Sequence, residues 1–337
     1  MQYKLNVKTL APGDIILVGY NDDDSRKIQE RTKSHYSHAM LYWYGSIIHA
    51  ADIVITANPS RMLFEEDEPV RILRLKQEHW SPLRIKCLIE YARSFVGTFY
   101  DIDALHAMRD GEEVKPNPNR QMCSKFVAQC YDYVCLDLVE DYELCSPEDI
   151  NKSDLLCEVE EPLLETTQED IDFTKSFDVT KKQFKAIWYF LRILNRKFPE
   201  EDIVSLKQLE AFIEKNPSKA DDVLDLLNQT EYFRLWELEK EHCQYLYNVE
   251  DFINKWKDDA VIQAIAVKND CQRIIEEKRG DIQAYKKKIE TIGDIAYYRK
   301  MIELRENIIS AAEERFAVAE KVLAKKRVVK IKIPTIN

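Results

Sequence analysis

The chain of 337 residues has little glycine, and what it has is unevenly placed. The seven glycines are Gly13, Gly19, Gly45, Gly97, Gly111, Gly280 and Gly293. Only the last two lie beyond the first third of the chain. Because glycine marks turns, turns are expected early and long helices late. The pattern changes near Pro162, and we predict a first domain over residues 1–160 and a helical domain over residues 161–337.

The motifs of several cofactor classes are missing. The sequence has no GxGxxG or Walker A glycine loop, which argues against a nucleotide cofactor. It has neither CxxC nor HExxH spacing, and Cys130 and Cys135 share one expected helix without a nearby histidine. We therefore predict no cofactor and no bound metal.

Clustered basic residues and long apolar runs are also scarce. The net charge is -11, with 49 Lys and Arg against 60 Asp and Glu, so a nucleic-acid partner is not expected. No run is apolar enough to predict a transmembrane segment, and residues 1–8 contain no apolar signal segment. We expect a cytoplasmic protein, or one delivered by a secretion system that reads no signal peptide. The eight cysteines lack regular spacing and are predicted to be free thiols.

Short apolar runs between turn residues occupy the first part of the chain, which is typical of strands. Strands are predicted over residues 14–18, 37–44, 47–55 and 70–75, with a two-residue loop at Gly45-Ser46 joining the second to the third. Helical spacing of apolar residues follows over 82–95 and again from Cys123 onward. The prediction is an α+β domain in which a small antiparallel sheet packs on the cysteine-bearing helix, followed by an all-helical domain.

The later part of the chain has helical periodicity. Thr180 and Gln183 are expected to form a capping box in front of an apolar helix. From Cys271 onward, apolar residues fall at heptad spacing, and Gly280 and Gly293 are each expected to end a helix. We favour a helical bundle or coiled-coil hairpin folded back within the chain over an oligomer. Residues 327–333 alternate in polarity and are a candidate C-terminal strand.

Two residues of the first domain suggest chemistry. A thiol attacks as the thiolate, and both a helix N-terminus and an imidazole lower its pKa. Cys123 is expected at a helix start and His38 at a strand start, so we predict nucleophile and base. His35 competes as the base, but an odd spacing places it on the opposite face of an extended strand. The cysteines interpreted as buried core residues are Cys130, Cys135, Cys145 and Cys157.

Five segments occur in one order along the chain: Pro12-Gly13-Asp14-Ile15-Ile16-Leu17, Ser37-His38-Ala39-Met40-Leu41-Tyr42, Ile47-Ile48-His49-Ala50, Gly97-Thr98-Phe99-Tyr100-Asp101 and Met122-Cys123-Ser124-Lys125-Phe126-Val127. This order resembles that of circularly permuted, NlpC-type papain-like cysteine hydrolases of the YiiX/YebB-like branch. The lecithin retinol acyltransferase-like proteins share it. In that branch a histidine opens an HVGIY-like strand, and the cysteine follows at the start of a CSELV-like helix. The resemblance covers about residues 10–150.

The resemblance implies that Cys123 is the nucleophile, His38 the base and His49 the third polar residue. It also implies that Tyr100 lies near the oxyanion, and Ser124 is a weaker candidate for oxyanion or substrate positioning.

Three positions qualify the resemblance. With a loop at Gly45-Ser46, His49 would lie opposite Tyr42 and two pairs from His38, so a bulge or a shifted register is needed. Otherwise Asp52 or Asp101 would orient His38. Lys125 stands where the family has an acidic residue, and Met40 where it has a small one.

These features predict a cysteine hydrolase that cleaves an amide or isopeptide bond through an acyl-enzyme. One alternative is an acyl hydrolase or acyltransferase acting on a lipid. Another is an interaction protein whose helical domain binds a protein partner while the papain-like domain is inert.

Overall fold

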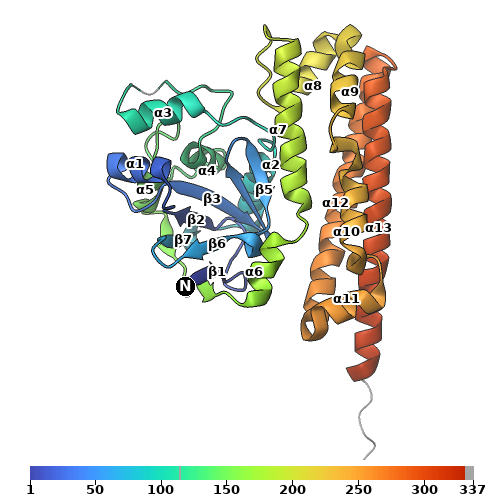
Figure 1. The fold of residues 1–337 in the computed structure, drawn as a ribbon, viewed down its shortest axis with the longest axis horizontal. Coiled ribbons are helices and arrows are strands. Elements are labelled where there is room, and N and C mark those ends of the chain that lie inside the picture. Colours follow the sequence, from blue (N-terminus) through green and yellow to red (C-terminus); the bar gives the residue numbers. More distant parts are fainter. Residues whose placement is uncertain (114, 331–337) are drawn as a thin grey trace, which may run out of the picture. The chain divides into compact units, whose positions relative to one another are not determined.

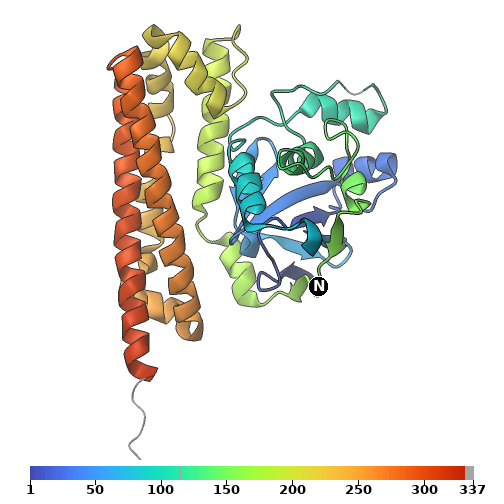
Figure 2. The same ribbon diagram turned by 180° about the vertical axis from the view of Figure 1, so that it is seen from behind.

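A computed structural model of the chain describes residues 1–113 and 115–330. The chain forms two compact units, Met1–Ala211 and Phe212–Asn337. The first unit combines sheets and helices, and the second is helical (Figures 1 and 2). The sequence placed a domain boundary at residue 160, whereas the compact units divide at residue 211.

The strands of the first unit form two antiparallel sheets. The strands are β1 (Gln2–Leu5), β2 (Ile15–Val18), β3 (His38–Trp43), β4 (Ser46–Ala50), β5 (Val54–Ala57), β6 (Leu63–Glu65), β7 (Val70–Leu75), β8 (Leu156–Glu158) and β9 (Leu163–Glu165). The larger sheet has the order β5-β4-β3-β2-β7-β8, and the smaller has the order β6-β1-β9. The predicted strand over 47–55 is wrong in one respect. It is two strands, because the chain reverses after Ala50 and β5 pairs back onto β4.

The helices of the first unit are α1 (Asp23–Thr32), α2 (Pro82–Arg93), α3 (Ile102–Asp110), α4 (Cys123–Asp132), α5 (Pro147–Asn151), α6 (Gln168–Lys175) and α7 (Val179–Lys197). The predicted helices at 82–95 and from Cys123 onward are confirmed as α2 and α4. The sequence analysis did not foresee α1 and α3, which are short and bury few residues. Each begins with an aspartate cap, since Asp22 accepts from the Ser25 N–H and Asp101 from the Ala104 N–H.

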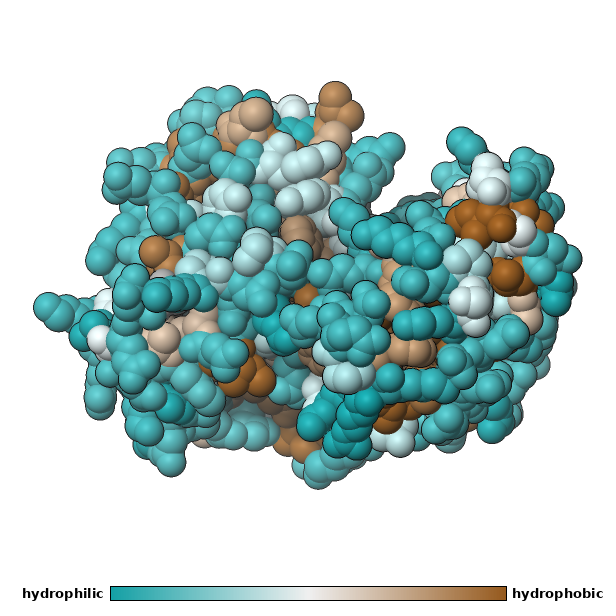
Figure 3. Space-filling model, turned by 90° about the horizontal axis from the view of Figure 1, so that it is seen from above, coloured by the Kyte–Doolittle hydropathy of each residue, from teal (hydrophilic) through white to brown (hydrophobic). Residues whose placement is uncertain are grey.

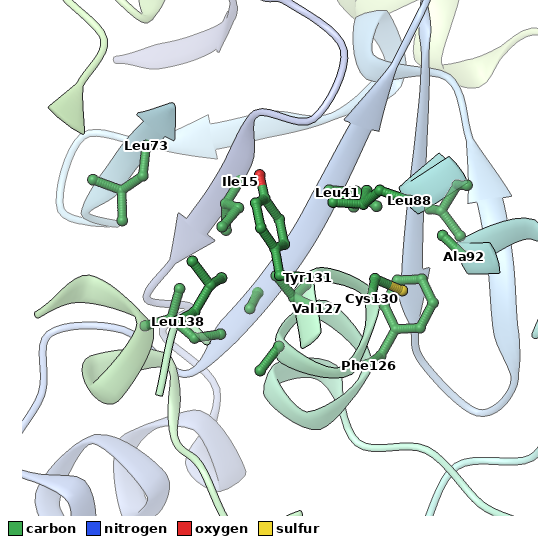
Figure 4. Packing of buried hydrophobic residues seen from close by; sticks show 14 of the residues in the cluster. Ile15, Leu41, Leu73, Leu88, Ala92, Phe126, Val127, Cys130, Tyr131 and Leu138 are labelled. Carbon is green, nitrogen blue, oxygen red and sulfur yellow. The ribbon is translucent and has the colours of Figure 1, made fainter. Parts of the chain in front are cut away.

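Helix α4 packs on one face of the larger sheet, together with α2 (Figure 4). Phe126, Val127 and Tyr131 of α4 are fully buried there against Ile15 and Leu41 of the sheet. The Tyr131 hydroxyl donates a short hydrogen bond to the Gly13 carbonyl, which ties the helix to the start of β2. This packing confirms the predicted α+β arrangement, in which an antiparallel sheet lies on the cysteine-bearing helix.

The smaller sheet covers the other face of the larger one. Leu5 of β1 and Phe64 of β6 are buried against Ile16, Met40 and Ile72 of the larger sheet. With both faces covered, the middle strands lie in an apolar interior, and every residue of β2 is buried.

Arg61, between β5 and β6, binds the segment that connects α6 to α7. The Arg61 guanidinium donates to the carbonyls of Phe173, Ser176 and Phe177 at 2.9, 3.1 and 2.5 Å, and it lies 3.7 Å from the Asp178 carboxylate. Asp178 is also the N-cap of α7. The predicted capping box of Thr180 and Gln183 is therefore wrong, since α7 already begins at Val179.

The helices that follow are α8 (Leu206–Lys215), α9 (Ala220–Asn228), α10 (Leu235–His242), α11 (Val249–Trp256), α12 (Ala260–Ile292) and α13 (Ala296–Lys330). In the second unit α12 and α13 form an antiparallel hairpin that turns at Gly293, where φ is +130°. Ion pairs such as Lys268–Glu320 join the two helices. The predicted helix end at Gly280 is wrong, because α12 runs through it.

Two further predictions need correction. The candidate strand over 327–333 is not formed in the part that the structure describes, because residues 327–330 belong to α13, and residues 331–333 lie outside the described residues. All eight cysteines are free, as expected, but Cys135 and Cys157 are exposed and not buried core residues. Cys135 lies beyond the end of α4, at a position with φ of +58°, and Cys157 lies in the edge strand β8.

No helix in the described residues is long and apolar enough to cross a membrane. On the face shown in Figure 3, hydrophilic residues predominate, and the hydrophobic residues occur in small separate groups.

Candidate active site

Cys123 is the first residue of α4. Its predecessor Met122 is extended (φ -109°, ψ 160°) and offers no capping side chain, so the N–H groups of the first turn are not satisfied by a cap. Cys123 as a whole is 5% exposed. It donates to the Ser37 carbonyl at 3.8 Å, and the Tyr100 hydroxyl lies 4.0 Å from the sulfur.

Burial raises the pKa of the Cys123 thiol above its ordinary value. The N–H groups of Ala39, Ser124 and Cys123 and the Tyr100 hydroxyl act in the opposite direction, but they do not outweigh the loss of solvent. The sequence led us to expect a lowered pKa from the helix terminus and a nearby imidazole. That expectation is wrong in its net sign, because the residues covering the sulfur come from distant segments of the chain.

His38 and His49 form a pair on adjacent strands. Trp43 pairs with Ser46, so the loop of the hairpin is Tyr44-Gly45, both with positive φ, and not Gly45-Ser46. This register places His49 opposite Met40, one pair closer to His38 than expected. The shifted register was one of the two ways in which the histidines could meet. His38 Nε2 and His49 Nδ1 lie 2.9 Å apart.

Burial holds both imidazoles in the neutral form. It lowers the pKa of His38 to about 4, partly opposed by the Asp22 carboxylate. It lowers the pKa of His49 to about 3, with a further contribution from His38. At neutral pH the site therefore contains a thiol and two neutral imidazoles, and not a thiolate–imidazolium pair.

The structure brings His38 close to Cys123 without joining them. The sulfur lies against the backbone on both sides of His38, near the Ser37 carbonyl and the Ala39 N–H. No hydrogen bond links Cys123 to His38 among the described residues, since the thiol donates to Ser37. Nε2 of His38 is occupied by His49, so Nδ1 is the nitrogen that remains for the thiol.

The other sequence candidates have different surroundings. His35 is exposed and lies before β3, and its carbonyl accepts from Gln29. The Ser124 hydroxyl donates to the Cys145 carbonyl at 2.6 Å, so it is held away from the sulfur, and only the Ser124 N–H acts on the thiol. Asp52 accepts the Tyr100 N–H through its carbonyl at 3.0 Å. The Asp101 carboxylate is buried and caps α3.

Sequence reasoning missed Tyr20. Its ring lies 5.9 Å from the ring of His38, and its hydroxyl is near enough to Glu68, and to Cys123 when that thiol is ionised, for their charges to raise its pKa. Burial raises the pKa of Tyr20 well above its ordinary value. Its position two residues after the buried strand β2, whose end adjoins the start of β3, was the available signal. Tyr20, in the loop after β2, thus lies near the site in addition to Tyr100.

The described residues contain no group of three or more His, Cys, Asp or Glu side chains that could hold a metal ion. A cysteine at a helix start, with paired histidines on the adjoining sheet, is the arrangement expected of a papain-like thiol hydrolase in permuted order.

The comparisons with known proteins agree with this class. Residues 9–184, more than half of the chain, match the family described as permuted papain-like amidase enzyme, YaeF/YiiX, C92 family. The chain belongs to this family, and it is a thiol hydrolase of the permuted papain-like class.

A solved structure is similar to part of the chain. It is described as the crystal structure of metalloprotein yiiX from Escherichia coli O157:H7. The identity is 18% and the TM-score 0.38, and the match covers 45% of this chain and 97% of that one. No curated protein matches the chain.

Proposed function

We propose that the protein is an amidase in which Cys123 attacks the carbonyl carbon of an amide or isopeptide bond and His38 is the general base. The observation that carries this proposal is the 2.9 Å contact between His38 and His49 beside the nucleophile. A neutral His49 that accepts from Nε2–H leaves Nδ1 of His38 as the basic nitrogen. Substrate binding closes the remaining gap by drawing the thiol from the Ser37 carbonyl to Nδ1.

In the first half-reaction the sulfur forms a bond to the carbonyl carbon while its proton passes to His38 Nδ1. The developing oxyanion is stabilised by N–H groups at the start of α4 and by the Tyr100 hydroxyl. The C–N bond then breaks, the amine leaves with the proton from His38, and a thioester on Cys123 remains. Water attacks the thioester, with His38 again taking a proton, and the carboxylic acid and the free thiol are released.

The charges around the site favour an amide over an anionic lipid. Three carboxylates act electrostatically on residues of the site: Asp22 on His38, Glu68 on Tyr20, and Asp101 on Tyr100. These negative groups favour a substrate with a positive charge near the scissile bond, such as a lysine side chain, and disfavour a phosphate headgroup.

Trapping of the acyl-enzyme tests the proposal. The probes are two matched fluorogenic peptide amides, with lysine or glutamate beside the scissile bond, and vesicles of phosphatidylglycerol. We expect faster cleavage of the lysine peptide and a transient acyl adduct, located on Cys123 by peptide mass spectrometry. The adduct should disappear in Cys123→Ala and persist in the control Cys135→Ala, which removes an exposed thiol. Peptide cleavage by Cys123→Ala, or hydrolysis of the phospholipid alone, would overturn it.

A further inference from the structure

A lysine without solvent contact lies in the first turn of the nucleophile helix. The side chain of Lys125 is 0% exposed, and its Nζ lies 2.6 Å from Glu143 Oε2. Nζ also donates to the Asn117 carbonyl at 3.1 Å. A buried ammonium is costly unless it is paired, so both contacts are needed to hold it there. This position is acidic in the CSELV-like pattern, and here the charge is reversed and its partner is supplied by the loop before α5.

From Asn117 a chain of hydrogen bonds leads to the residues on either side of Tyr100. The Asn117 N–H donates to the Asp101 carboxylate at 2.7 Å, and the Asp101 N–H donates to the Gln121 carbonyl at 2.9 Å. The Gln121 N–H in turn donates to the Phe99 carbonyl at 3.0 Å. The segment 117–121 therefore hydrogen-bonds the residues before and after Tyr100, namely Phe99 and Asp101. Lys125 in turn hydrogen-bonds this segment at Asn117.

We propose that Lys125 is a positioning residue that fixes the Tyr100 hydroxyl against the Cys123 sulfur through the segment 117–121. Residues two apart on a helix are separated by about 200°, so Lys125 points away from Cys123 and acts through Tyr100. Its importance for catalysis rests on the proposed function, but its effect on the thiol does not. Among the described residues, the titratable groups near Cys123 include Tyr20 after β2, His38 on β3, Tyr100 before α3 and Cys145 before α5.

The test is the pH profile of Cys123 alkylation by iodoacetamide, followed by peptide mass spectrometry. Tyr100→Phe removes a hydrogen bond to the sulfur and should move the profile to higher pH by about 0.5–1 unit. Lys125→Met should cause a similar shift. The double variant should shift no further than the larger single change, because both act on one contact. The matched control is Lys152→Met, which removes a 70% exposed lysine paired with Glu148 and should leave the profile unchanged.

Two outcomes would overturn the proposal: an unchanged profile in folded Lys125→Met, or shifts of Lys125→Met and Tyr100→Phe that add in the double variant. If Lys125→Met does not fold, Lys125→Met/Glu143→Leu replaces the ion pair by apolar side chains and should show the same shift. An unshifted profile in this variant equally contradicts the proposal. Alkylation of Cys123 does not require catalytic turnover. If the shifts of the two variants are coupled but the protein cleaves no amide, the proposed function is wrong, while the positioning role of Lys125 stands.

Discussion

His38 Nε2 lies 2.9 Å from His49 Nδ1, so two residues 11 positions apart in sequence share one proton position. Only one of the two nitrogens can carry the hydrogen while both rings are neutral. When His38 carries it, His38 Nδ1 is free to accept a proton. When His49 carries it, His38 becomes a donor at Nδ1 and cannot act as base. In the proposed mechanism, the tautomer of His49 thus decides whether His38 can act as the base.

Substitutions at His49 should separate these roles. His49→Asn retains an acceptor oxygen for Nε2–H and should lower kcat less than His49→Leu, which we expect to lose about 10²-fold as orientation of the base is lost. The measurement is steady-state cleavage of the lysine peptide amide. Equal activity of His49→Leu and the wild-type protein would show that His49 does not orient His38.

Stability should decrease in mild acid because of the two partly buried, desolvated histidines His38 and His49. Their pKa values of about 4 and 3 lie below the unfolded value near 6.5, so the unfolded chain binds more protons as the pH falls. Their contribution is fully present above pH ~6.5 and is lost below it, down to about pH 4 for His38 and about pH 3 for His49, at up to about 1.4 kcal/mol per pH unit for each residue. Urea unfolding at a series of pH values measures this slope.

The control for this pH dependence is the double variant His38→Gln/His49→Asn, which lacks both titrating imidazoles. Its free energy of unfolding should depend less on pH between 6.5 and 4. A slope as steep as that of the wild-type protein would assign the acid sensitivity to carboxylates elsewhere.

The cysteines should react in an order set by exposure and not by the helix terminus. Iodoacetamide at pH 7 is expected to modify the exposed Cys135 and Cys157 before Cys123, because burial raises the pKa of the Cys123 thiol. Modification of Cys123 should accelerate as the pH rises above 9. Peptide mass spectrometry over time gives the order. Selective labelling of Cys123 at pH 7 would mean that a thiolate is already present in the free enzyme.

Arg61 should control the stability of the connection between α6 and α7. Arg61→Met removes its hydrogen bonds to the carbonyls of Phe173, Ser176 and Phe177 and its pairing with Asp178, and should cost about 1–3 kcal/mol. Limited proteolysis should then cut within residues 173–178 faster than in the wild-type protein. Arg26→Met is the control, since Arg26 makes an exposed pair with Asp23. Equal cleavage rates in the two variants would contradict the role of Arg61.

The sequence by itself determined the elements whose signals are local. The apolar run at 70–75 and the helical spacing from Cys123 onward predicted β7 and α4 at the observed residues. The order of the short motifs then indicated the permuted papain-like fold. Helices α1 and α3 were not predicted because they are short and bury few residues, which leaves no clear apolar periodicity. The helix end expected at Gly280 was wrong because packing along the hairpin outweighs the propensity of one glycine.

Only the tertiary structure decided how the site residues meet. The positive φ of Tyr44 set the register that brings His49 to His38, and a one-residue difference in the loop is invisible to periodicity. The sign of the Cys123 pKa shift depends on desolvation by distant segments, while the sequence reveals only the nearby helix terminus. The same holds for Lys125, whose partners Glu143 and Asn117 are 18 and 8 residues away in the sequence. Periodicity reports a residue's own element, whereas charge, burial and register depend on which other elements lie against it.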